Sequence, residues 1–94
     1  MSNSTKMHVV NMRSNRGNEV PNQFIITTEA GKFFQSYKSV IAFIPANSGK
    51  IQLDRTYWDY SKTTGKYRNE FLGESKTETS AKIAAGIYEL TNLN

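Results

Sequence analysis

The spacing of apolar residues changes after Arg55, and this change constrains the fold more than any other feature of the sequence. Before it, short apolar runs separated by turn residues are typical of β-strands. After it, apolar residues recur at helical spacing, as Tyr67 and Phe71 do. A chain of 94 residues that carries both patterns predicts a single α+β domain. We expect an antiparallel sheet of five or six strands with two short helices on one face.

Turn residues divide the first part of the chain into five expected strands, and a sixth closes it. Gly31 tolerates positive φ, so Glu29–Lys32 is expected to be a tight reversal. Pro21 has no N–H to donate, so the second strand is expected to begin after it. Lys38–Ser39 interrupts the apolar pattern and indicates a bulge or corner. The expected strands are Met7–Met12, Asn22–Thr28, Phe33–Tyr37, Val40–Ile44, Lys50–Arg55 and Ile87–Leu93.

Two short helices are expected between the fifth strand and the last. The first runs to Leu72 and is ended by Gly73, which is suited to the left-handed residue after a helix. The second is expected over Thr77–Ala85, with Gly86 as its stop. Small polar residues lie where each helix would begin and can accept the first free N–H groups. The candidate N-caps are Asp59 or Ser61 for the first helix and Ser75 or Thr77 for the second.

Composition indicates where the domain begins and which cellular compartment suits it. Met1–Thr5 is small and polar, and we expect it to be a disordered tail ahead of a domain spanning residues 6–94. This start lacks the apolar core of a signal peptide, and no apolar run approaches the length of a membrane span. The chain has no Cys, so it has neither disulfides nor a thiolate zinc site. A reducing cytoplasm is the natural setting, and we expect no membrane partner.

The residue types needed for catalysis are scarce. Nucleophilic catalysis needs a nucleophile beside a base, and the only imidazole, His8, lies inside an expected strand. Glu70, Glu74 and Glu78 recur every four residues, but Gly73 lies between them and a solvated face is the expected arrangement. We therefore expect no catalytic residues, no metal ligands, no cofactor and no enzymatic activity.

The most informative stretch, residues 54–71, interleaves aromatic rings with cations. Between Tyr60 and Asn69 it carries three cations and no acid. Rings stack on bases and Lys or Arg neutralise phosphates, so this mixture is typical of single-strand binding. It is also typical of protein-binding hot spots, and of a helix whose rings are core and whose cations are solvated. The candidate binding residues here are Arg55, Tyr57, Trp58, Tyr60, Lys62, Lys66, Tyr67 and Arg68.

A second candidate site is the loop that contains Arg13 and Arg16 beside Gly17. Two Arg residues next to Gly and small polar residues can form an anion-binding concavity of backbone N–H groups. The alternative is an ordinary loop whose Asn and Gly residues supply turn geometry. This loop and the stretch of residues 54–71 would make one basic surface if the fold brings them together.

The sequence is compatible with three classes of binding partner. The net charge of +4, from 12 Lys and Arg against 8 Asp and Glu, favours polyanions. Nucleic acid is the first hypothesis, an acidic protein the second, and a nucleotide-like anion the third. Apolar residues on both faces of the strand Asn22–Thr28 leave open whether both faces are covered within the domain or one is a contact in a homo-oligomer.

The stretches that carry a resemblance to a known family include Ser14–Ile26, Phe34–Tyr37, Tyr57–Gly73 with its Trp58-Asp-Tyr-Ser segment, and the close Leu90–Asn94. In these stretches the chain resembles a family of short phage proteins of unknown function. The resemblance implies a phage origin and action in the cytoplasm of a bacterial host, but no activity and no functional residues. Small phage proteins without catalytic sites often bind host defence or transcription proteins, or DNA.

Overall fold

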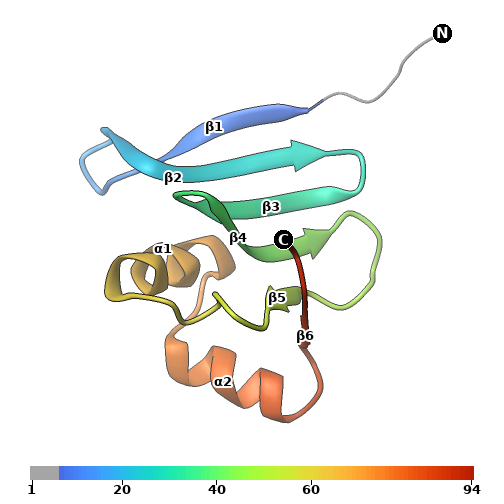
Figure 1. Ribbon diagram of the computed structural model, residues 1–94. Helices are drawn as coiled ribbons and strands as arrows, with labels where there is room; N and C mark the ends of the chain where they lie inside the picture. The colour runs from blue at the N-terminus through green and yellow to red at the C-terminus, as the bar shows by residue number, and fades with distance from the viewer. Residues whose placement is uncertain (1–6) are drawn as a thin grey trace, which may run out of the picture.

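The computed structural model describes residues 7–94, and the expected tail Met1–Thr5 lies outside the described residues. Figure 1 shows one six-stranded sheet with two helices, so the predicted α+β class is confirmed. Neither helix of this described part is long and apolar enough to cross a membrane. The elements are β1 (His8–Arg13), β2 (Glu19–Thr28), β3 (Gly31–Ser36), β4 (Ser39–Pro45), β5 (Gln52–Asp54), α1 (Lys62–Leu72), α2 (Lys76–Ala84) and β6 (Glu89–Thr91).

The strands lie in the sheet in chain order, and each neighbouring pair is antiparallel except β5 and β6, which are parallel. Adjacent parallel strands need a crossover connection, and here that connection contains both helices. A crossover passes over one face of the sheet, which is why α1 and α2 lie on the same side. Of the two helices, α1 packs against β3, where the Phe71 ring meets the Phe34 ring and the Thr64 hydroxyl meets the Ser36 hydroxyl. Figure 1 shows α2 farther from β3, below β5.

The covered face of the sheet holds the core. Ile25, Phe34, Ala42 and Leu53 form one row across β2, β3, β4 and β5, and the last three are fully buried. The ring of Phe71 from α1 lies 5.7 Å from that of Phe34, centroid to centroid. Because strand side chains alternate, every second residue of β3 is available to this core.

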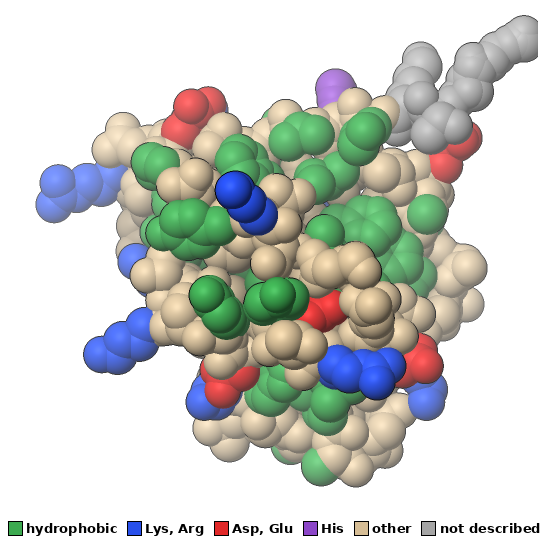
Figure 2. Space-filling view, in the orientation of Figure 1, with side chains coloured by type: hydrophobic (Ala, Val, Ile, Leu, Met, Phe, Trp, Pro, Cys, Tyr) green, Lys and Arg blue, Asp and Glu red, His purple; other side chains and the backbone are tan. Residues whose placement is uncertain are grey.

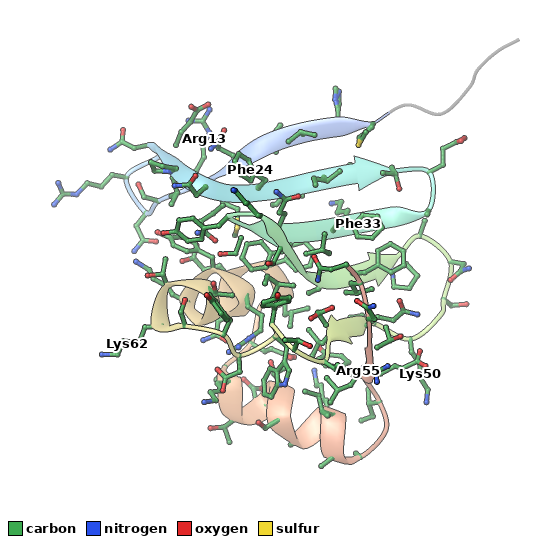
Figure 3. The ribbon with its side chains drawn as sticks, viewed as in Figure 1. Arg13, Phe24, Phe33, Lys50, Arg55 and Lys62 are labelled. Atoms are coloured by element: carbon green, nitrogen blue, oxygen red, sulfur yellow. The ribbon has the colours of Figure 1, made fainter. Side chains whose placement is uncertain are left out.

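The other face, which we call the open face, is also apolar. Val9, Ile26, Phe33 and Phe43 form a row on it, and Phe24 lies on the same face one row along. Their side chains are partly or largely exposed, and none belongs to the buried core. The rings of Phe33 and Phe43 stack on each other with centroids 4.3 Å apart. Figure 2 shows hydrophobic side chains in several groups across the strands, and Figure 3 labels Phe24 and Phe33 among them. Both faces of β2 are therefore apolar, but within the described domain the core covers only one of them.

Local signals fixed the helix ends. The Ser61 hydroxyl accepts a hydrogen bond from the N–H of Thr64, so Ser61 rather than Asp59 is the N-cap of α1. Gly73 takes the left-handed conformation after α1, as predicted. The N-cap of α2 is Ser75 in a reciprocal capping box with Glu78, which starts the helix at Lys76 rather than Thr77.

The bounds of every strand differ from those expected, by as much as three residues at the start of β2. β2 begins at Glu19 and includes Pro21, because the β1–β2 register shifts next to it and no ladder partner is needed there. β5 and β6 have three residues each, shorter than the expected strands 50–55 and 87–93. Their pairing is limited to each other and, for β5, to β4. Lys38 is part of the β3–β4 turn, and the bulge lies instead at Ile41, the extra residue between Val40 and Ala42.

The expected solvated face of glutamates is wrong for Glu74, whose side chain is only 5% exposed. Its carboxylate accepts hydrogen bonds from Lys82 Nζ at 2.6 Å, Thr79 Oγ1 at 2.6 Å and Tyr88 OH at 2.9 Å. Burial alone would raise the pKa of Glu74, but these donors outweigh it and hold the pKa below its ordinary value. The left-handed turn at Gly73 reverses the chain and leaves Glu74 between α2 and the segment before β6.

Candidate nucleic-acid interface

Two residues of the predicted binding segment lie in the interior of the fold. Tyr67 is 8% exposed and Arg68 is 1% exposed. With Thr64 they form the buried side of α1, since residues three and four apart share one helical face. The prediction that Tyr67 and Arg68 are available to a partner is therefore corrected, because the sequence spacing did not show which side of α1 faces the sheet.

Arg68 instead joins α1 to the turn before it. Its Nη1 donates to the carbonyl oxygen of Trp58 at 2.6 Å and its Nη2 to Asn69 Oδ1 at 2.9 Å. The guanidinium carbon lies 5.2 Å from the centre of the Trp58 ring, and Nη1 lies 3.6 Å from Asp59 Oδ1. Burial lowers the pKa of Arg68, and the Asp59 carboxylate opposes this. Trp58 is partly buried against the core, so both residues hold the segment in place.

The exposed rings border a depression that we call the aromatic groove. Its volume is about 560 Å³. Tyr60 is 67% exposed and Tyr37 is 52% exposed. The rings of Tyr57 and Tyr60 meet edge to face with centroids 5.5 Å apart. The residues that line the groove are Asn22, Ser36, Tyr37, Lys38, Ser39, Ile41, Tyr57 and Tyr60.

A second depression, the cationic hollow, lies at the first turns of α1 and has a volume of about 480 Å³. Lys62, Lys66 and Lys76 are among the residues that line it, and all three are exposed. Asp59 is the one acid among its lining residues, and its Oδ2 lies 2.8 Å from Lys76 Nζ. The N-terminal end of a helix adds partial positive charge to the same place. The hollow is lined by Asp59, Ser61, Lys62, Gly65, Lys66, Arg68, Asn69 and Lys76.

One short segment separates the two depressions. Tyr60 lines the aromatic groove, and the next residue, Ser61, lines the cationic hollow. The N–H of Tyr60 donates to the carbonyl oxygen of Tyr57 at 3.2 Å, and Ser61 caps α1, so the segment is held at both ends. Rings and cations thus adjoin without sharing one depression.

Of the predicted arginines, Arg13, Arg16 and Arg55 lie outside both depressions, whereas Arg68 is among the residues that line the cationic hollow. Arg13 donates from Nη1 to the carbonyl oxygen of Gly17 at 2.7 Å, inside its own loop, and Arg16 is exposed in that loop. Figure 3 shows Arg13 and Lys62 toward the left of the molecule, with Arg55 and Lys50 toward the lower right. The fold therefore places Arg55 apart from Lys62, although the two are seven positions apart in sequence.

Sequence reasoning missed Tyr37, Lys38 and Lys76 as site residues. Tyr37 and Lys38 lie in the β3–β4 turn and reach the groove only through the packing of the sheet against residues 57–60. Lys76 begins α2 and reaches the hollow because Gly73 reverses the chain. The adjacent aromatic and cation at positions 37 and 38 were a signal of the same kind as that used for residues 54–71.

Within residues 7–94 no three acidic or His side chains gather as a metal site. No curated protein and no solved structure matches the chain. The model of a family described as "Family of unknown function (DUF8033)" matches residues 7–86, most of the chain. The geometry described above thus belongs to a member of the DUF8033 family.

Proposed function

We propose that this protein binds nucleic acid across the segment between the aromatic groove and the cationic hollow. The observation that carries the proposal is the adjacency of exposed Tyr60, on the groove, to a hollow bordered by Lys62 and Lys66. Bases stack on aromatic rings, and lysines neutralise phosphates, so a strand needs these two surfaces side by side. The net charge of +4 would attract such a polyanion from a distance.

The proposal includes a setting. We place the protein in a phage-infected bacterial cytoplasm as an accessory factor, in line with the resemblance of its sequence to short phage proteins. An inhibitor of an acidic host protein, or a protein that sequesters a nucleotide-like anion, would use the same tyrosines and lysines. The experiment that follows separates nucleic acid from these two alternatives.

The test is fluorescence anisotropy with labelled oligonucleotides of DNA and RNA over a range of salt concentrations. We expect the affinity to fall linearly on a log–log plot as salt rises, because binding releases counterions. The double variant Lys62→Gln and Lys66→Gln should weaken binding and lower the slope by about 0.7 for each lysine that contacts a phosphate of a single strand.

A matched control is the double variant Lys50→Gln and Arg55→Gln. It removes the same charge from exposed side chains on the other side of the molecule (Figure 3). We expect it to change affinity little. The proposal is wrong if the wild-type protein binds no oligonucleotide at low salt, or if both double variants weaken binding equally, which would mean that only net charge matters. In the first case, a nuclease-treated pull-down from host lysate tests the protein-partner alternative.

A further inference from the structure

Backbone strain gathers at the aromatic groove. Among residues 7–94, only two residues other than Gly have positive φ: Asn22 at 66° and Tyr37 at 56°. Both line the groove, and the N–H of Tyr37 donates to the carbonyl oxygen of Asn22 at 2.7 Å. Asn tolerates this conformation well, whereas a bulky residue such as Tyr is an outlier in it. Strained residues of this kind persist where the surroundings hold them, and they cluster at functional sites.

Tyr37 combines a strained backbone with an exposed ring. Tyr37 lies in the turn between β3 and β4, where Gly or Asn would fit the same backbone without strain. Gln35 Nε2 donates to the carbonyl oxygen of Tyr37 at 2.7 Å and so helps to hold the turn. The ring is 52% exposed and packs into no core, so its burial does not offset the strain. The folded state is therefore less stable with Tyr at position 37 than it would be with Gly, and the Tyr ring stays at the edge of the groove.

A buried polar side chain adjoins the same place. Gln23 is fully buried, and neither its Nε2 nor its Oε1 has a hydrogen-bond partner among the described residues. Its chain neighbour Asn22 and its cross-strand neighbour Ser36 both line the groove. Buried side-chain amides are nearly always paired, so an unpaired one needs an explanation. Strain and an unpaired amide thus occur together at one wall of the groove.

We infer that the aromatic groove receives one unpaired nucleobase, so that the ligand of this site is a single strand rather than a duplex. The inference rests on the proposed function and specifies its substrate class. Tyr37, Tyr57 and Tyr60 offer ring faces and edges, with Ile41 as an apolar residue of the lining. In a duplex the faces of each base are covered by its neighbours, so only an unstacked base can enter between tyrosines.

The test compares three labelled probes of one length at one salt concentration: a single strand, its duplex, and a strand whose bases are replaced by abasic sites. We expect the single strand to bind about tenfold more tightly than the abasic strand, because one stacked base supplies that much. The duplex binds through its phosphates alone because its base faces are covered, so its affinity should not depend on the ring of Tyr37.

The variant Tyr37→Gly separates the role of the ring from the stability of the fold. Gly adopts the observed backbone without strain, so this variant should stay folded, as circular dichroism would check. We expect it to lose about tenfold in single-strand affinity and to bind the abasic strand unchanged. Tyr37→Phe keeps the ring and should keep the preference for the single strand.

The outcomes separate the two proposals. If the wild-type protein binds none of the probes, the proposed function fails and the inference fails with it. If it binds single strand, duplex and abasic strand alike, and Tyr37→Gly changes none of these, the inference is overturned. Nucleic-acid binding would then stand on the weakening caused by Lys62→Gln and Lys66→Gln.

Discussion

Phe33 and Phe34 are neighbours in the chain and lie on opposite faces of one sheet, where they have different roles. Phe34 has no exposed surface and lies in the core under Phe71, whereas Phe33 is partly exposed and stacks on Phe43. Nothing in either residue type distinguishes them. The difference teaches that the position of the helices, rather than apolar character, decides which ring supports the fold.

The covered face also holds the polar exceptions. Gln23 and Ser36 lie on it and are buried, and the Ser36 hydroxyl is 2.9 Å from the Thr64 hydroxyl of α1. Gln35, on the open face, bonds to a backbone carbonyl and stays partly exposed. Burial makes an unpaired amide costly on one face and inconsequential on the other. Pairs of matched residues on the two faces therefore test the comparison directly.

The largest expected difference in stability is between truncating Phe34 and truncating Phe33. Phe34→Ala should lower the free energy of unfolding by about 3–5 kcal/mol, because it removes a buried ring and leaves a cavity. Phe33→Ala should cost about 1 kcal/mol, since its ring loses only one aromatic contact and partial burial. Urea denaturation followed by circular dichroism measures both. Equal losses for the two variants would show that the open face is covered in solution, for example by a second copy of the chain.

The next largest expected effect on stability comes from the buried carboxylate of Asp54. Asp54 is 1% exposed and accepts hydrogen bonds from the N–H groups of Thr56, Tyr57 and Leu93 and from the side chain of Asn94. Burial acts to raise the pKa of Asp54, but these donors outweigh it and lower the pKa. Asp54→Asn should therefore cost about 2–3 kcal/mol at neutral pH, because donors to a charged acceptor lose their partner.

Because the pKa values of Asp54 and Glu74 are lowered in the folded state, the stability that their carboxylates contribute depends on pH. A carboxylate with a lowered pKa in the folded state contributes stability above its unfolded pKa of about 4, and the contribution is lost as pH falls through the folded pKa. Asp54 and Glu74 both act in this direction. Urea midpoints measured between neutral pH and about pH 3 should fall more for the wild-type protein than for Asp54→Asn. Glu29→Gln, at an exposed position, serves as the control and should leave the profile unchanged.

The smallest expected effect is a gain in stability, on replacing the buried Gln23. Gln23→Met keeps the approximate shape of the side chain and removes an amide that is buried without partners, so it should raise the free energy of unfolding by about 1 kcal/mol. Gln35→Met removes the bond to the Tyr37 carbonyl and should lower it by up to about 1 kcal/mol. Thermal or urea unfolding distinguishes the two. A loss of stability in Gln23→Met would show that this amide is paired in solution.

Local signals were sufficient for much of the fold. Ser61 and Ser75 start the helices because a hydroxyl before a helix satisfies its first N–H groups, and Gly73 ends α1 because it alone lacks the Cβ penalty of the left-handed region. The same kind of reasoning failed at Pro21, which lies inside β2, because the register shift that tolerates it depends on β1.

The candidate site was predictable only in part. Tyr57, Tyr60, Lys62 and Lys66 were named from their mixture of rings and cations, and they border the two depressions. Tyr37, next to Lys38, carried a signal of the same kind, but its place in the same groove as Tyr57 depends on the packing of the sheet against the segment after β5.

By itself, the sequence determined the order of strands and helices, the short list of candidate caps, and the density of rings and cations, because these depend on neighbours within a few positions of the chain. Only the tertiary structure decided that Tyr67 and Arg68 are interior, that Glu74 is buried, and that Arg55 lies apart from Lys62. The physical reason is that a helix or strand has more than one face, and which face loses its water depends on elements distant in sequence.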